Sequence, residues 1–266
     1  MKILNQVIAV ALTALLLFSC SSTKDATMDA DKIKGTSAPI TSTVKILSIN
    51  LAHSLQDKTD VKQFADWVKT TGAEVVAVQQ ITRPRESQQG FDSYRELLNR
   101  LDMRGTFAKA RYFQGWDSGN ALLSMYPLLQ SNAYMLPVGK GKVRRSLSFG
   151  VFELGLKSVA FASTDLDDVD SDERLKQVRE IFSIQKSLEE FPIIVTGNFG
   201  ERSNGQSSAA MVAQYQASHS TSDQLSVVTQ HVYVPLQKKM TILSAEKVVY
   251  KPLNQNGVIV TVQIEQ

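Results

Sequence analysis

Six carboxylates fall within nine residues near the middle of the chain, and they form its densest group of side chains able to do chemistry. They are Asp165, Asp167, Asp168, Asp170, Asp172 and Glu173. Clustered carboxylate oxygens suit hard divalent cations. An EF-hand frame that starts at Asp168 fails, because Glu173 stands where that loop needs glycine and Arg179 where it needs a bidentate glutamate. The run therefore favours a solvated loop leading into a helix, with a specific cation site as the alternative.

Other reactive side chains are scarce. The sequence has one cysteine, Cys20, and three histidines, His53, His219 and His231. A single cysteine excludes an internal disulfide and a zinc ion held by several thiolates. We expect the histidines to be solvated or packed, because His53 falls in a predicted loop, His219 in a Ser-rich segment and His231 in a predicted strand. Any chemistry must therefore rest on carboxylates or be absent.

The charge balance argues against a protein that holds nucleic acid mainly through phosphate contacts. There are 29 Lys and Arg residues against 26 Asp and Glu residues, a formal net charge of +3 over 266 residues, whereas such proteins carry strongly basic surfaces. The one basic cluster, Gly139–Arg145, is predicted to be a charged hairpin turn, with contact to an anion or to lipid headgroups as the alternative. The sequence thus gives no strong nucleic-acid signal.

The N-terminal segment is typical of an exported lipoprotein. The apolar run Val7–Phe18 is too short to span a bilayer but fits the core of a signal peptide over residues 1–19. Leu17–Cys20 resembles a bacterial lipobox, in which the cysteine is acylated and becomes the new N-terminus. Residues 20–43 are polar and predict a flexible tether. Since Ser21 resembles the sorting pattern of Gram-negative outer-membrane lipoproteins, we expect a lipid-anchored protein at that membrane of the cell envelope.

Residues 44–266 are expected to form one domain. Strands are predicted at Val44–Leu51, Val75–Val78, Ala121–Ser124, Leu147–Leu154, Lys157–Ala162, Pro192–Thr196, Val227–Val234, Met240–Tyr250 and Val258–Ile264. Helices are predicted from an Asp60 cap to Gly72 and at Ser93–Leu101, Glu173–Leu188 and Gly205–Ser218. Trp116 is predicted in a loop that lines a cleft. Strands outnumber helices and the helices lie between them, which favours a two-sheet core with helices outside.

Five segments, read in order, resemble the motif series of the endonuclease/exonuclease/phosphatase superfamily of metal-dependent phosphoesterases. They are Ile46–Asn50, Glu74–Gln80, Gly119–Ser124, Ser163–Asp167 and Pro192–Gly200. A closing strand follows Asn256 and Gly257, where that family carries an Asp-His pair. The resemblance spans essentially all of Val44–Gln266. It implies an α+β fold, a four-layer αββα sandwich of two mixed sheets packed face to face with helices outside.

The resemblance also implies a chemistry, in which an acid after the second strand binds Mg²⁺ or another divalent cation that polarises the phosphate. A terminal histidine deprotonates the attacking water, and an Asp, an Asn and a second histidine position the reactants. This sequence keeps the family's first asparagine, Asn50, and the aspartate at Asp167. The remaining family positions fall on Gln80, Asp165, Asn198, Gly200, Asn256 and Gly257, in place of Glu, His, Asp, Asn, Asp and His.

These departures predict that the metal anchor and the general base are lost. A carboxylate at Asp165 would also repel a bound phosphate by about 4 kcal/mol at about 4 Å and an effective dielectric near 20. We therefore expect no competent catalytic residue, no cofactor, and a binding or scaffolding module for a protein or small-molecule ligand. The alternative is an active phosphodiesterase or phosphomonoesterase in which Asp165 and Asp167 hold a divalent cation.

Overall fold

A computed structural model describes residues 41–85, 89–188, 190–236 and 239–265. The expected signal peptide, Cys20 and most of the expected tether lie outside these residues. The first strand begins at Thr41 and pairs with Glu265, so the folded domain starts three residues before the expected boundary at residue 44. No helix in the described ranges is both long and apolar enough to cross a membrane.

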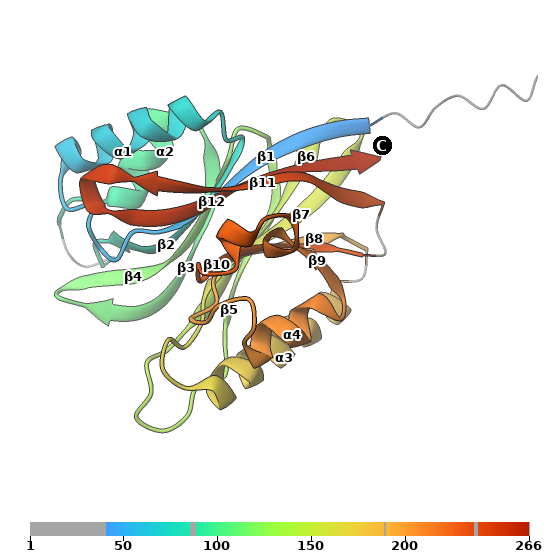
Figure 1. Ribbon diagram of the computed structural model, residues 1–266. Coiled ribbons are helices and arrows are strands. Elements are labelled where there is room, and N and C mark those ends of the chain that lie inside the picture. The colour runs from blue at the N-terminus through green and yellow to red at the C-terminus, as the bar shows by residue number, and fades with distance from the viewer. Residues whose placement is uncertain (1–40, 86–88, 189, 237–238, 266) are drawn as a thin grey trace, which may run out of the picture. The chain divides into compact units, whose positions relative to one another are not determined.

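The described chain forms two six-stranded sheets (Figure 1). The first has the order β11-β12-β1-β2-β4-β3 and the second the order β5-β6-β7-β8-β10-β9. Both sheets are mixed, because β1 and β2 run parallel in the first, β7 and β8 run parallel in the second, and the other neighbours are antiparallel. The strands of the first sheet are β1 (Thr41–Asn50), β2 (Val75–Arg83), β3 (Arg104–Phe113), β4 (Trp116–Ser124), β11 (Met240–Tyr250) and β12 (Gln255–Glu265). Those of the second are β5 (Leu128–Met135), β6 (Ser146–Leu154), β7 (Lys157–Asp165), β8 (Ile193–Asn198), β9 (Tyr215–Ala217) and β10 (Gln230–Pro235).

Successive side chains along each strand point to opposite faces of its sheet, and this produces the layers of the fold. In β1, Val44 and Ile46 join a core shared with strands of the second sheet, whereas Leu47 and Ile49 face the helices on the other side. Helices α1 (Lys58–Thr71) and α2 (Ser93–Leu101) cover the outer face of the first sheet, and α3 (Ser171–Ser187) and α4 (Gln206–Val212) cover that of the second (Figure 1). The expected αββα sandwich is thus confirmed.

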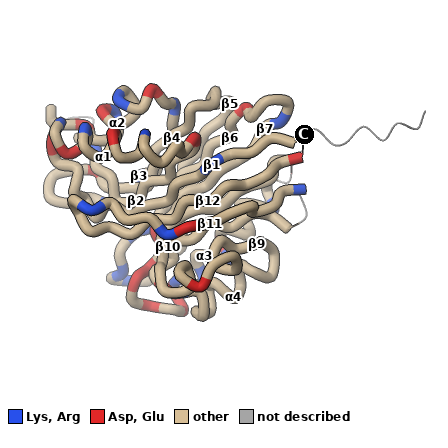
Figure 2. Tube along the Cα trace, turned by 45° about the horizontal axis from the view of Figure 1, so that its top comes forward, with Lys and Arg blue, Asp and Glu red and all other residues tan. Residues whose placement is uncertain are grey.

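Helices α1 and α2 carry both basic and acidic side chains on their surface. Basic and acidic residues alternate along α1 and α2 (Figure 2), and pairs such as Lys62 with Asp66 and Arg100 with Glu96 lie one helical turn apart. These two helices therefore present no surface of a single sign.

Several element boundaries differ from the sequence prediction. Helix α1 is capped by Asp57, whose side chain accepts from two backbone N–H groups, and the predicted cap Asp60 lies in the first turn. The predicted helix over residues 205–218 ends at Val212, because Tyr215–Ala217 pairs with β10 as strand β9. Strand β10 begins only at Gln230, three residues later than predicted.

Besides β9, two further strands were not predicted. Strands β3 and β5 lie at sheet edges, and many of their side chains are exposed, so they lack the apolar run that marks a buried strand. Trp116, predicted in a loop, is the first residue of β4.

Candidate functional site

The predicted site residues converge near the carboxyl ends of four strands, β1, β2, β7 and β8. Asn50 is the last residue of β1, Asp165 the last of β7 and Asn198 the last of β8. Because β1 and β2 are parallel, as are β7 and β8, the carboxyl ends of each pair lie at the same edge. The two edges meet across the sandwich, which brings side chains 115 residues apart in sequence into hydrogen-bond contact.

Asp165 is the centre of this arrangement. Its Oδ1 accepts from Asn198 Nδ2 at 2.8 Å and from Asn50 Nδ2 at 3.3 Å. Its Oδ2 accepts from Gln80 Nε2 at 3.0 Å and from Arg145 Nη1 at 2.5 Å. An ionised carboxylate offers about four lone-pair positions, and four N–H donors fill them here. Three of these donors stand at positions where the resemblance implies metal or phosphate contacts, and here they donate to Asp165.

Arg145 supplies the only formal positive charge in contact with this carboxylate among the described residues. Its side chain is 5% exposed, and it also pairs with Asp168 at 2.9 Å. Burial raises the pKa of Asp165, and the Arg145 guanidinium with the Gln80 and Asn198 amides acts in the opposite direction. Since every group facing the carboxylate is an N–H donor, the site is arranged for the ionised form.

The position of Arg145 corrects two sequence expectations. The segment from Gly139 to Arg145 is not entirely a solvated turn, because its last residue is buried against Asp165. The expected repulsion between Asp165 and a phosphate group is likewise offset by the adjoining guanidinium. Arg145 was missed as a site residue, although the β6–β7 hairpin gives a signal. Leu154 pairs with Lys157, and following that register back sets Ser146, next to Arg145, opposite Asp165.

A backbone irregularity aims Gln80 at the site. Its φ is +55°, unusual for a residue that is not glycine, and the β2–β4 register shifts between Gln79 and Ile81. The extra residue lets successive glutamines point in different directions. Gln79 is fully buried and donates to Ser163 Oγ at 3.0 Å, while Gln80 reaches Asp165.

A layer of buried polar side chains joins the two sheets next to the site. Ser48 and Gln79 of the first sheet meet Ser163 and Gln230 of the second, with 3.0 Å between Ser48 Oγ and the Gln230 amide. Buried polar groups of this kind are stable only when hydrogen-bonded. The layer therefore fixes the relative position of the two sheets directly beneath Asp165. Gln230 was also missed from the sequence, which offers no signal for it beyond its place near the start of a strand.

The Asp167 side chain accepts hydrogen bonds from the loop that follows it and not from the donors around Asp165. Its Oδ1 accepts from the backbone N–H of Val169 at 2.9 Å and of Asp170 at 2.7 Å. Burial alone would raise the pKa of this carboxyl, but the Asp170 and Val169 donors outweigh it and hold the pKa below its usual value. Asp165 and Asp167 therefore face different sets of donors.

Of the remaining family positions, Gly200 has no room for a side chain, Gly257 has little, and Asn256 lies at the rim. Gly200 has φ +65°, and a Cβ there would lie 2.4 Å from the Asp167 carbonyl oxygen. A Cβ on Gly257 would lie 3.0 Å from the Ser48 carbonyl oxygen. Asn256 is exposed on β12. The backbone at the two glycines is thus packed for a residue without a side chain.

Asn50, Gln80 and Asn198 border an open cleft of about 360 Å³. Six of the side chains that line it end in amides: Asn50, Gln80, Asn198, Gln230, Gln255 and Asn256. The others are Ala52, Val227, Val228 and Thr229. None of these lining residues carries a charge, so the cleft presents neutral donors and acceptors beside a small apolar wall.

The donor set does not fit the divalent cation that the resemblance implies. Gln80 directs an amide N–H, not a carboxylate oxygen, toward the site, and both oxygens of Asp165 are taken up by N–H groups. The Arg145 guanidinium also lies where a second cation would be repelled. Within the described residues, no three or more His, Cys, Asp or Glu side chains come together in a way that could hold a metal ion.

The three histidines lie away from Asp165's donors. His53 Nε2 is 2.7 Å from Ser118 Oγ, and burial followed by the Arg111 charge lowers its pKa to about 4. His219 and His231 are paired, with 3.3 Å between their Nδ1 atoms. Burial, assisted by His219, lowers the pKa of the fully buried His231 to about 4. His231 is thus packed as expected and is neutral at pH 7, as is His53.

No family model matches the sequence, and no curated protein matches it. Solved structures do match. An endonuclease/exonuclease/phosphatase from Beutenbergia cavernae is similar at TM-score 0.69 and 13% identity, over 84% of this chain and 72% of that one. The human Nocturnin catalytic domain, solved with a bound sulfate anion, gives 0.68 and 13%, over 85% and 96%.

A mannosyl-6-phosphatase from Bacteroides thetaiotaomicron is similar at TM-score 0.64 and 14% identity, over 82% of this chain and 99% of that one. At these identities the likeness concerns the backbone arrangement and not the site chemistry. It agrees with the two mixed sheets and outer helices described above. The chain therefore has the fold of the endonuclease/exonuclease/phosphatase superfamily.

Proposed function

We propose that this domain is a non-catalytic binding module, in which the cleft of a phosphoesterase fold has become a site for an uncharged polar ligand. The observation that carries the proposal is the set of four N–H donors around Asp165, from Asn50, Gln80, Asn198 and Arg145. A catalytic phosphoesterase needs these positions to bind a cation and a phosphate. Here all four groups donate to Asp165.

Loss of the general base supports the same proposal. The family's terminal histidine corresponds to Gly257, which has no side chain to take a proton from water. His53, His219 and His231 offer no replacement, because none of them lines the amide cleft or contacts Asp165. Removing a general base alone typically costs about 10²–10⁴ in rate.

The lining of the cleft supports an uncharged ligand. Amide side chains offer both donors and acceptors and carry no charge, so they suit hydroxyl or amide groups on a small molecule. A charged ligand would lose its hydration without gaining an ion pair from any residue that lines the cleft. Val227 and Val228 provide the apolar part of the contact.

The proposed setting is the bacterial cell envelope. The lipobox-like Leu17–Cys20 supports acylation at Cys20, and Ser21 supports sorting to the outer membrane of a Gram-negative bacterium. Replacing Cys20 with serine should move the protein from the membrane pellet to the soluble fraction after fractionation of expressing cells. Continued sedimentation of the Cys20→Ser protein with membranes would contradict the anchor.

The loss of catalysis is tested on the mature chain from residue 20 with Cys20→Ser. Calorimetric titration with MgCl₂, MnCl₂ and CaCl₂ should give no saturable heat, and bis-p-nitrophenyl phosphate and p-nitrophenyl phosphate should not be hydrolysed above background. Asp168→Ala serves as the matched control for Asp165→Ala, because both carboxylates contact Arg145. Metal-dependent turnover that Asp165→Ala and Asp167→Ala abolish and Asp168→Ala retains would establish the active phosphoesterase instead.

A further inference from the structure

A second, smaller pocket of about 200 Å³ adjoins the amide cleft. Ala52 lines the cleft and the next residue, His53, lines the pocket. Four of its lining side chains carry rings and four are polar without charge: His53, Phe91, Phe113 and Trp116, and Gln56, Thr82, Ser93 and Gln114. Neither the sequence motifs nor the Asp165 network involves this pocket.

The ring faces are held in place by their surroundings. The His53 imidazole stacks on Phe113 with 3.9 Å between ring centroids and 16° between planes, and its Nε2 contacts Ser118 Oγ. The Trp116 ring lies against the backbone at Gly90, where a Cβ would come within 2.3 Å of it. Flat surfaces fixed before binding lower the entropic cost of taking up a ligand.

The polar side chains of the pocket fall into two groups. Ser93 Oγ donates to the Leu55 carbonyl oxygen at 2.6 Å, and Thr82 Oγ1 lies 3.2 Å from Ser93 Oγ, so both hydroxyls are held. Gln56 and Gln114 are exposed at the rim, and neither side-chain amide has a hydrogen-bond partner among the described residues. The rim therefore offers amide donors and acceptors beside the aromatic faces.

We infer that this pocket binds the pyranose ring of an uncharged sugar. A pyranose has C–H groups that pack on aromatic faces and hydroxyl groups around its edge that bond to amides and hydroxyls. No side chain that lines the pocket is charged, so a sugar binds there without needing an ionic group. The Arg111 guanidinium lies over the Phe113 ring, 5.7 Å from its centre, and is itself not part of the lining.

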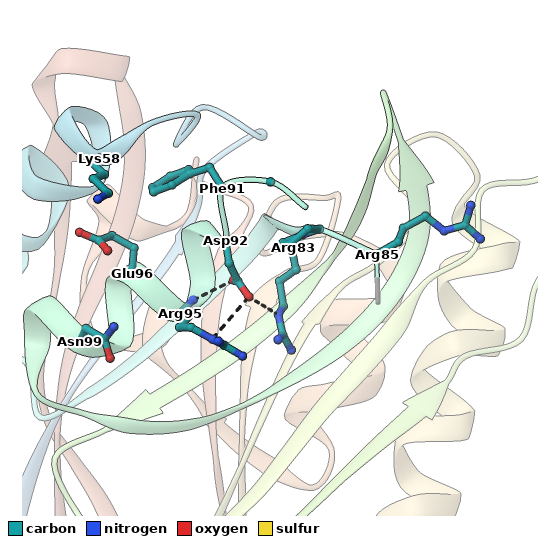
Figure 3. A pocket seen from close by; sticks show the side chains of 10 residues that line it. Lys58, Arg83, Arg85, Phe91, Asp92, Arg95, Glu96 and Asn99 are labelled. Atoms are coloured by element: carbon teal, nitrogen blue, oxygen red, sulfur yellow. Dashed lines mark hydrogen bonds and ion pairs between the residues drawn. The ribbon is translucent and has the colours of Figure 1, made fainter. Parts of the chain in front are cut away.

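A neighbouring, larger pocket of about 470 Å³ is a weaker candidate although it is basic. Its Arg83 and Arg95 both approach the Asp92 carboxylate, at 3.1 and 4.0 Å (Figure 3). Arg83 also lies over the Tyr94 ring. These basic groups are partnered by side chains of the protein itself, whereas the rim amides of the aromatic pocket are not.

The two tryptophans of the chain allow a direct test. Trp67 packs beside Phe64 and Tyr250 on the helix side of the first sheet, so Trp67→Phe leaves Trp116 as the sole tryptophan, inside the pocket. The mature Cys20→Ser chain with this change would be titrated with methyl glucoside, maltose, cellobiose, mannobiose and chitobiose while Trp116 emission is recorded. At least one should give a saturable change with a dissociation constant in the millimolar range or below.

Variants locate the response. Phe113→Ala should weaken binding at least tenfold, and Gln114→Ala, at the exposed rim, should weaken it severalfold without risk to folding. Tyr112→Ala is the matched control, because Tyr112 is on the same strand, is 53% exposed and lies outside the pocket. It should bind sugar as the parent does.

Three outcomes would overturn the inference: no response to any of these sugars by a protein with native circular dichroism, an unchanged affinity in both Phe113→Ala and Gln114→Ala, or a response to glucose 6-phosphate alone. These outcomes do not test the proposed function, which concerns the cleft beside Asp165 and not this pocket. If Asn256→Ala in the cleft abolishes the response while Phe113→Ala does not, the sugar lies in the cleft. That result supports the proposed function and refutes the pocket.

Discussion

Replacing Asp165 with asparagine should destabilise the domain far more than any other removal of one carboxylate from this loop. The substitution keeps the side chain's size but sets an amide against four N–H donors and leaves the Arg145 guanidinium, 5% exposed, without its buried partner. Breaking a buried ion pair from one side typically costs about 3–5 kcal/mol. Since a domain is stable by only about 5–15 kcal/mol, such a loss is easily measured.

Urea unfolding followed by far-ultraviolet circular dichroism gives the free energy and its denaturant slope. The slope should not change, because the folded surface is the same. The matched control is Asp168→Asn, which removes a carboxylate from the same guanidinium but at a position whose side chain is 68% exposed. Its cost should stay below about 1 kcal/mol. A loss below about 1 kcal/mol for Asp165→Asn, or equal losses for the two variants, would refute the central role given to Asp165.

Three further predictions concern stability and the proposed loss of catalysis. His231 is fully buried with a pKa lowered from 6.5 to about 4. Its contribution to the free energy of unfolding is therefore complete above pH 6.5 and falls by about 3 kcal/mol as the pH drops toward 4. The His231→Gln variant should flatten this part of a plot of urea midpoint against pH. Gly200→Ala should cost about 2 kcal/mol more than Gly141→Ala in urea unfolding, since both residues have positive φ but only the first would place a Cβ 2.4 Å from a carbonyl oxygen; equal costs would contradict the packing argument. Gln80→Glu should lower the melting temperature at pH 7 more than at pH 4, because it sets a second carboxylate beside Asp165, and it should not create metal-dependent hydrolysis of p-nitrophenyl phosphate.

The sequence located much of the site because its motifs end strands. Asn50, Asp165 and Asn198 each follow a short apolar run, and the carboxyl ends of parallel neighbours in one sheet lie together. The order of the motifs also predicted the two-sheet fold. Periodicity failed at the edge strands β3 and β5, whose partly exposed side chains carry no clear apolar pattern.

Other features depended on the pairing of strands and not on the composition of a single segment. The cluster containing Arg145 has the composition of a surface turn, and only the β6–β7 register brings its last residue to Asp165. The positive φ of Gln80 arises from the shifted pairing of β2 with β4, so the sequence gives no sign that adjacent glutamines face different sites. The cap of α1 was misplaced by three residues because Asp57 and Asp60 are both suitable capping residues.

If catalysis is lost as proposed, the Asp165 network predicts that no single substitution restores it. Asp165→His would remove the carboxylate that Arg145 and three amides share, leaving a buried cation beside an imidazole. Restoring the terminal base is opposed by backbone packing, because any side chain at Gly257 begins 3.0 Å from the Ser48 carbonyl oxygen. Asp165→His thus removes hydrogen bonds of the Asp165 network, and Gly257→His crowds the backbone of β1. The combination of Gln80→Glu, Asp165→His, Asn198→Asp and Gly257→His sets two new carboxylates close to Arg145, which would pair with them in competition with a metal ion. A competent metal site therefore requires a change at Arg145 as well.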